Sequence, residues 1–195
     1  PPEPIIWSIA ATTARSAGSN RSAPEEGARG RDGPEKKDGF MDHLVDLLSD
    51  GAVAAGLIVP GRKGLFAQLG QMAEREYGLD AASVIERLTE RERLGSTGFG
   101  AGVAIPHGKV DGLEHVVGLF VQLQPPVDFD AIDDLPVDLV FCLLSPPDSG
   151  AEHLKALALV SRWMRDSAFV AKLRGAASSD AVLALFAAAQ TRDAA

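Results

Sequence analysis

Cysteine is almost absent from this chain of 195 residues, since Cys142 is its only one, and a disulfide within the chain is thereby excluded. Cys142 lies in the apolar run 140–144, where a thiol is expected to fill the core as a small hydrophobic group rather than to act as a nucleophile. A chain without disulfides suits a reducing compartment, so we expect a cytoplasmic protein.

Long apolar runs and a surplus of basic residues are also missing. No run reaches the roughly 18 residues that a membrane-spanning helix needs, so we expect no membrane insertion. The 19 Lys and Arg residues stand against 27 Asp and Glu, and a formal net charge of −8 argues against nucleic acid as a partner. With 46% apolar and 24% charged residues, the remaining composition is that of an ordinary globular protein.

Several common functional motifs are lacking too. The glycines are not followed by the Gly-Lys-Ser or Gly-Lys-Thr of a P-loop, and no GxGxxG stands between a predicted strand and helix. No His or Cys pair has a metal-ligand spacing such as HxxxH or CxxC, so we expect neither a metal nor another cofactor. A hydrolase would need a nucleophile and an orienting acid near its base, and no such spacing is recognisable.

The first 39 residues differ in composition from the rest of the chain. They are rich in Pro, Gly, Ser, Ala, Arg and Glu, and their basic and acidic side chains balance, so residues 40–195 carry the whole net charge. Such a segment cannot bury enough apolar surface to offset its chain entropy, and residues 1–39 are predicted to be disordered. Because the chain begins at Pro1 and Met41 precedes the first periodic segment, one hypothesis is that the native protein begins near Met41.

Residues 40–195 show alternating strand and helix patterns, which predict a single α/β domain. Short apolar runs, most of them closed by proline, predict strands at 56–60 (an edge strand), 103–105, 116–123 and 137–144. Helical spacing predicts helices at 44–48, 62–77, after Asp80 as N-cap, after a capping box of Ser149 and Glu152, and at 167–174 and 179–189. Since the strands are apolar on both faces, we expect helices to cover both sides of the sheet.

The stretch 95–109 is the strongest candidate for a functional site. Eight consecutive residues of this stretch contain four glycines, Gly95, Gly98, Gly100 and Gly102. A backbone so rich in glycine can approach an anion closely and offer it N–H groups. The hydroxyls of Ser96 and Thr97 can donate to phosphoryl oxygens. His107 follows Pro106 at the end of a predicted strand, and an imidazole near its pKa of about 6.5 is nucleophilic at one nitrogen while the other is hydrogen-bonded. This arrangement suits the handling of a phosphoryl group.

Two further side chains are candidates for the same site. His153 is expected in the first turn of a helix that follows a strand end, where anions bind favourably, although an exposed histidine without a role fits the position too. Arg91 can hold a phosphate with two N–H groups or equally lie on a solvated helix face. Four nearby aspartates are interpreted as a solvated turn rather than a metal site: Asp128, Asp130, Asp133 and Asp134.

The residues around this stretch resemble a known family. The pair Arg91-Glu92, the run 95–100 and the run 103–108 (Val-Ala-Ile-Pro-His-Gly) are similar to the signature of enzyme IIA domains of the fructose/mannitol/nitrogen type. These domains belong to the bacterial phosphoenolpyruvate-dependent phosphotransferase system. The similarity runs from about residue 44 to 186 and implies a mixed sheet sandwiched between helices. A lone domain resembles the nitrogen-related, regulatory branch most.

The resemblance also implies roles for the candidate residues. His107 would take a phosphoryl group from a small histidine phosphocarrier, HPr or its nitrogen-branch relative, with His153 assisting and with Arg91 and Thr97 at matching positions near the site. Ala101 stands where relatives often have Asn, which removes a side-chain hydrogen bond there. Two outputs stay open: regulation of partner proteins by the phosphorylation state, or passage of the phosphoryl group to an enzyme IIB in sugar transport.

Overall fold

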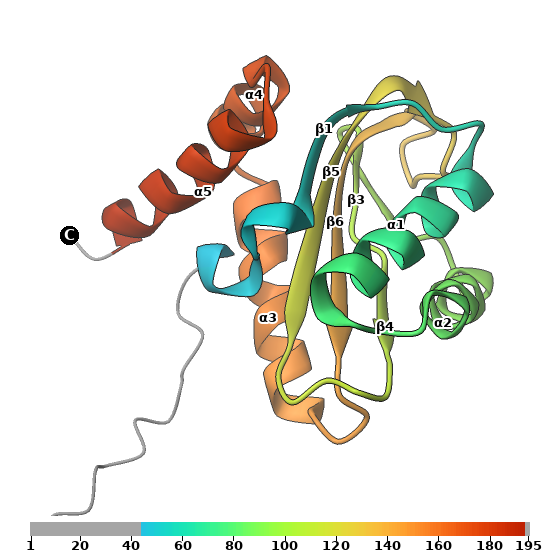
Figure 1. Ribbon diagram of the computed structural model, residues 1–195. Coiled ribbons are helices and arrows are strands. Elements are labelled where there is room, and N and C mark those ends of the chain that lie inside the picture. Colours follow the sequence, from blue (N-terminus) through green and yellow to red (C-terminus); the bar gives the residue numbers. More distant parts are fainter. Residues whose placement is uncertain (1–43, 194–195) are drawn as a thin grey trace, which may run out of the picture. The chain divides into compact units, whose positions relative to one another are not determined.

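A mixed sheet lies at the centre of the structure (Figure 1). The computed structural model describes residues 44–193, with side chains up to Ala189, so the predictions for residues 1–39 and for a start near Met41 lie outside the described residues. The strands in chain order are β1 (Val53–Leu57), β2 (Gly98–Gly100), β3 (Val103–Ala104), β4 (His107–Lys109), β5 (Val117–Val127) and β6 (Val137–Ser145).

The long strands β5 and β6 pair antiparallel in the middle of the sheet. Strand β1 adds parallel to β5 at one edge, β3 and β4 both pair parallel with β6, and β2 closes the other edge antiparallel to β3. The prediction of a mixed sheet is confirmed.

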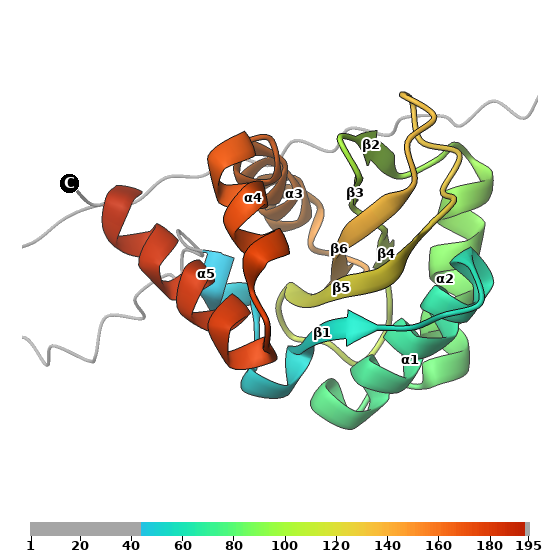
Figure 2. The ribbon, with the colours of Figure 1, turned by 90° about the horizontal axis from the view of Figure 1, so that it is seen from above.

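Helices cover both faces of the sheet, as Figures 1 and 2 show from two directions. One face carries α1 (Arg62–Tyr77) and α2 (Ala81–Arg93). The other carries α3 (Gly150–Met164), α4 (Ser167–Gly175), α5 (Ser179–Asp193) and the short 3-10 helix η1 (Leu44–Leu47), which η2 (Asp50–Ala52) follows. None of the helices within residues 44–193 is long and apolar enough to cross a membrane.

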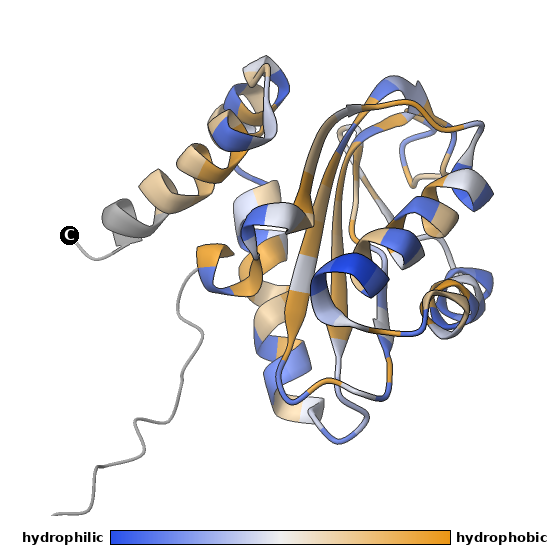
Figure 3. Ribbon diagram, in the orientation of Figure 1, coloured by the Kyte–Doolittle hydropathy of each residue, from blue (hydrophilic) through white to orange (hydrophobic). Residues whose placement is uncertain are grey.

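Burial on both faces explains this sandwich. Successive residues of a strand point to opposite faces, and Leu119 and Phe120 of β5 are both fully buried, one under α1 and α2 and the other under α3 to α5. Figure 3 shows the corresponding apolar colour along β5 and β6. Cys142 of β6 is buried as well, which confirms it as a core residue, and burial raises the pKa of its thiol.

An aromatic cluster fixes α5 against the sheet. The ring of Phe186 lies edge-to-face on Phe120, Phe141 and Phe169, with centroid distances of 5.1, 5.8 and 5.6 Å. Such pairs each contribute about 0.5–1.5 kcal/mol beyond their buried area. The C-terminal helix is therefore an integral part of the second core layer.

Two predictions of strand bounds were wrong in detail. The edge strand β1 ends at Leu57, and Ile58, expected within it, is 76% exposed; the edge position itself is confirmed. The strand expected at 116–123 continues to Val127 through two prolines. Proline cannot donate to the ladder, and the pairing with β6 is accordingly irregular between Gln122 and Val127 before it resumes.

The two predicted helix starts had opposite outcomes. Asp80 caps α2 as expected, since its carboxylate accepts a hydrogen bond of 2.8 Å from the Ser83 N–H. The capping box at Ser149 was wrong. The Ser149 hydroxyl donates to the carbonyl of Pro146 at 2.7 Å, and the backbone at Ser149 lacks the extended conformation from which a serine reaches the helix N–H groups.

The tight turn between β2 and β3 forces two residues into the left-handed region. Ala101 has φ +55° and Gly102 has φ +78°. A Cβ on Gly102 would lie 2.5 Å from the Arg174 guanidinium, so a side chain there would displace Arg174, and the positive φ also favours glycine. Ala101 keeps both backbone groups occupied, donating to Asp133 at 2.7 Å and accepting from Arg174 at 2.6 Å.

Ala101→Asn is expected to raise the free energy of unfolding by about 1 kcal/mol, because Asn tolerates the left-handed conformation better than Ala. Urea unfolding of the two proteins measures the change. Ala101→Val is the matched control and should lower stability, since a β-branched side chain is disfavoured at positive φ. A stabilising Val would contradict the assignment of strain to this turn.

Candidate functional site

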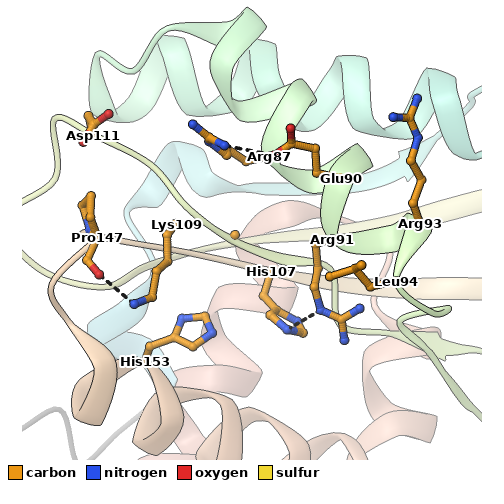
Figure 4. A pocket seen from close by; sticks show the side chains of 11 residues that line it. Arg87, Glu90, Arg91, Arg93, Leu94, His107, Lys109, Asp111, Pro147 and His153 are labelled. Carbon is orange, nitrogen blue, oxygen red and sulfur yellow. Dashed lines mark hydrogen bonds and ion pairs between the residues drawn. The ribbon is translucent and has the colours of Figure 1, made fainter. Parts of the chain in front are cut away.

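His107 begins β4, and hydrogen bonds hold both nitrogens of its ring. Figure 4 shows the bond to Arg91. Nδ1 lies 2.9 Å from the carbonyl oxygen of Ile105, and Nε2 lies 2.9 Å from Nε of Arg91. A carbonyl can only accept and a guanidinium can only donate, so we assign the ring proton to Nδ1 and a lone pair to Nε2. The imidazole is thus held with the lone pair of Nε2 directed at the guanidinium of Arg91.

Two elements bring these groups together. Strand β4 pairs with β6 in a register that sets His107 beside Leu143, while Arg91 comes from the last turns of α2, which packs over β4. Gly108 allows that approach, because a Cβ there would lie 3.3 Å from Cβ of Arg87. Arg91 also donates to the carbonyl of Gly95 at 3.0 Å, which fixes its guanidinium.

His153 lies in the first turn of α3, and its ring centroid is 5.4 Å from that of His107. Burial lowers the pKa of His153, and the nearby His107 and Lys109 lower it further. The pKa of His107 is also lowered, mainly by burial and additionally by Arg91, against the opposing effects of the Ile105 carbonyl and Glu92. Because the pKa values of both rings are lowered, the neutral form of each ring is favoured at pH 7.

The two histidines line an open cavity of about 660 Å³ (Figure 4). Basic side chains outnumber acidic ones around it, four to two: Arg87, Arg91, Arg93 and Lys109 against Glu90 and Asp111. Lys109 is held in place by a hydrogen bond of 2.7 Å from its ammonium to the carbonyl of Pro147. A cavity of this composition suits a doubly charged anion, although the whole chain is acidic.

The structure places Ser96, Thr97 and Gly98 beside a smaller hollow of about 220 Å³ that His107 and Arg91 also line. Their donors are already engaged within the chain. The Thr97 hydroxyl donates to Glu92 at 2.6 Å, the Ser96 hydroxyl donates to the carbonyl of Phe129 at 2.6 Å, and the Gly98 N–H donates to Ser96. Both hydroxyls hold the loop in this structure, and their donation to a phosphoryl group stays a prediction.

Two glycines of the predicted phosphate-binding loop lie elsewhere. Gly100 lines a separate hollow with Arg165 and Arg174, and Gly102 forms the turn between β2 and β3. The structure thus does not bring these two residues to the cavity of His107. The sequence left two positions open for Arg91, at the site or on a solvated helix face. In the structure, Arg91 lines the cavity and donates to His107.

Glu92 is a residue of the site that the sequence reasoning missed. Its carboxylate is 7% exposed and accepts from both the N–H and the hydroxyl of Thr97. It also pairs with Arg62 at 3.4 Å, and Arg62 in turn holds the carbonyl of Phe129 and the carboxylate of Asp130. The helix dipole disfavours a carboxylate in the last turn of a helix. The position of Glu92 near the end of α2 therefore indicated, from the sequence alone, that its carboxylate has a specific partner.

Aspartates of the 128–136 connection accept hydrogen bonds from backbone N–H groups in and next to this loop. Asp133 accepts from the N–H groups of Ala101 and Leu135, and these bonds lower the pKa of its carboxyl. Within residues 44–193 no group of three His, Cys, Asp or Glu side chains is arranged to hold a metal ion.

A mixed sheet between helices, with a histidine whose Nε2 accepts a hydrogen bond from an arginine at the edge of a basic cavity, defines a domain suited to binding a phosphoryl group. Residues 46–189 match the family described as phosphoenolpyruvate-dependent sugar phosphotransferase system, EIIA 2, and the chain belongs to that family.

Named relatives agree with this assignment. The nitrogen regulatory protein of Bradyrhizobium diazoefficiens is 42% identical over 144 residues, which cover 74% of this chain and 94% of the relative. The fructose-specific EIIA component of Haloferax volcanii is 32% identical over 76% of this chain and 81% of its own length. The crystal structure of nitrogen regulatory protein IIA-Ntr from Neisseria meningitidis superposes with a TM-score of 0.69 at 37% identity, covering 73% of this chain and 98% of that one.

Glu92→Ala is expected to lower the free energy of unfolding by about 2–4 kcal/mol, because the substitution leaves the Thr97 N–H and hydroxyl without their acceptor and removes one of the two carboxylates that pair with Arg62. Urea unfolding measures the loss. Glu86→Ala removes an exposed carboxylate from the same helix and should change stability by less than about 0.5 kcal/mol. Equal losses in the two variants would contradict a holding role for Glu92.

Proposed function

We propose that this protein accepts a phosphoryl group on Nε2 of His107 from an HPr-like histidine phosphocarrier, and that its phosphorylation state regulates partner proteins. The observation that carries the proposal is the pair of hydrogen bonds on the His107 ring. Nδ1–H donates to the Ile105 carbonyl, which leaves the lone pair on Nε2, and that lone pair accepts from Arg91, whose guanidinium can hold phosphoryl oxygens instead.

The transfer is a single in-line displacement. Nε2 of His107 forms a bond to phosphorus while the bond between phosphorus and the donor's nitrogen breaks, and the electron pair of that bond returns to the donor ring. Nδ1 keeps its proton, so the Ile105 carbonyl stabilises the positive charge that the ring gains. Arg91 exchanges its bond to Nε2 for bonds to phosphoryl oxygens, which places a positive charge where negative charge collects.

The surroundings of the cavity favour a protein as the phosphoryl donor. Leu94 borders the cavity and is 86% exposed, and Leu154, next to His153, is 66% exposed. Large apolar side chains exposed beside a charged cavity are typical of a surface that a partner protein covers. We propose that these two leucines contact the phosphocarrier, and that the exchange takes place in the cytoplasm.

Regulation is the favoured output because of the relatives named nitrogen regulatory protein, at 42% and 37% identity. The alternative is a sugar-transport enzyme IIA that passes the phosphoryl group to an enzyme IIB. The relative named as a fructose-specific EIIA component, at 32% identity, supports that alternative.

Incubation with phosphoenolpyruvate, the first enzyme of the system and the phosphocarrier should add one acid-labile phosphoryl group per chain. We expect His107→Ala to take up no label, because the nucleophilic nitrogen is gone. His153→Ala should be labelled at least about 10-fold more slowly, since it loses a polar group at the reacting phosphoryl. Scintillation counting and intact-mass spectrometry measure both.

His115→Ala is the matched control, because this substitution removes an exposed imidazole outside the cavity, and it should be labelled like the wild type. Label on His107→Ala would refute the acceptor assignment. Rapid loss of label from the wild type to an added enzyme IIB would favour the transport alternative.

The lowered pKa of His107 predicts a pH dependence. A protonated ring has no lone pair, so acceptance should be level from pH 7 to 8 and fall on acidification, with a midpoint below about 6.5. The stability of the folded protein should also fall on acidification. His107 binds a proton at about pH 6.5 in the unfolded chain but only at a lower pH in the folded protein, so the free energy of unfolding decreases across that window. NMR titration of the imidazoles gives the midpoints. A His107 midpoint above 6.5 would contradict the burial argument.

A further inference from the structure

Ser145 is a fully buried polar residue whose side chain meets the candidate site. It is the last residue of β6, with 0% exposure, and its Oγ lies 2.9 Å from Nδ1 of His153. Its backbone carbonyl accepts from the N–H of Val110, so the main chain belongs to the sheet while the hydroxyl is directed to the imidazole. A buried hydroxyl without a partner would be costly, and His153 is the partner that the structure provides.

The direction of this hydrogen bond follows from counting donors. If Nδ1–H of His153 donated to Oγ, the hydroxyl proton of Ser145 would itself need an acceptor in a fully buried place. If the hydroxyl donates to Nδ1, both groups are satisfied, and the ring proton of His153 resides on Nε2. Burial keeps this ring neutral, so the choice between its two tautomers is real.

Resting on the proposed function, we propose that Ser145 is a positioning residue for phosphoryl transfer. Its hydroxyl holds His153 as the Nε2–H tautomer, so that His153 donates a hydrogen bond to the phosphoryl oxygens on His107.

The two histidines then have opposite and complementary tautomers. The Ile105 carbonyl keeps the proton of His107 on Nδ1 and the lone pair on Nε2, where Arg91 donates to it, while Ser145 keeps Nδ1 of His153 free of a proton and puts the proton on Nε2. Both rings line the same cavity with centroids 5.4 Å apart. A donor fixed in advance needs no reorientation when negative charge arrives, and this is the condition for effective electrostatic stabilisation.

Nitrogen-15 NMR of the imidazoles in the full chain tests the tautomers directly, without any phosphoryl transfer. We expect the Nδ1–H form for His107 and the Nε2–H form for His153. In Ser145→Ala the unprotonated Nδ1 of His153 should lose its hydrogen-bond shift and the tautomers should mix, while His107 keeps its pattern and thereby reports an intact fold. Ser149→Ala is the matched control, because its hydroxyl donates to Pro146 and not to a histidine, and it should leave both patterns unchanged.

Labelling kinetics test whether Ser145 acts through His153. Ser145→Ala should slow labelling about 3- to 10-fold, Ser145→Thr should restore most of the rate, and Ser145→Ala should have no further effect in the His153→Ala background. An Nδ1–H form of His153 in the wild type, or effects of the two substitutions that multiply, would overturn the proposal. If the wild type takes up no label, the proposed function fails, and the NMR result still decides whether Ser145 fixes the tautomer.

Discussion

Strand β6 must be buried on both faces, and the rest of the structure depends on this constraint. Its residues from Val137 to Ser145 are almost all inaccessible, so the chain has to supply helices on both sides and strands on both edges. Strand β5 pairs on one edge, and β3 and β4 share the other. Strand β6 also places both histidines of the site, since His107 on β4 pairs with Leu143 of β6 and His153 lies on α3, which follows β6 in the chain.

The site is electrostatically different from the molecule around it. The chain has a net charge of −8, yet basic side chains surround the cavity, and they come from the end of α2 and from β4. Helix α2 therefore has two tasks. Arg91 faces the nucleophilic nitrogen of His107, while the neighbouring Glu92 turns inward and ties Thr97 to Arg62. Two adjacent residues of opposite charge thus have different roles: Arg91 contacts His107, and Glu92 holds the loop that contains Thr97.

Much of the fold was predictable from local patterns. Amphipathic spacing predicted α1 and α2, the Asp80 cap predicted the start of α2, and the apolar runs predicted β6 to within one residue and the start of β5, which continues four residues further than expected. The errors fell where non-local pairing decides. Strand β1 lies at 53–57 rather than 56–60, where it pairs with β5; Val53, for example, pairs with Phe120, which is 67 residues later in the chain. The Ser149 hydroxyl donates to Pro146, because the backbone at Ser149 does not direct it to the helix N–H groups.

By itself, the sequence determined the class of fold and pointed to His107 as the candidate acceptor, because hydrophobic periodicity and the run from Val103 to Gly108 are local properties of the chain. The tertiary structure alone decided what each polar group of the site does. The hydroxyl of Thr97 is turned to Glu92, the proton of His107 is set by Ile105, and Ser145 meets His153. Hydrogen-bond partners are chosen by distance and direction in the folded molecule, and burial gives each choice its energetic weight.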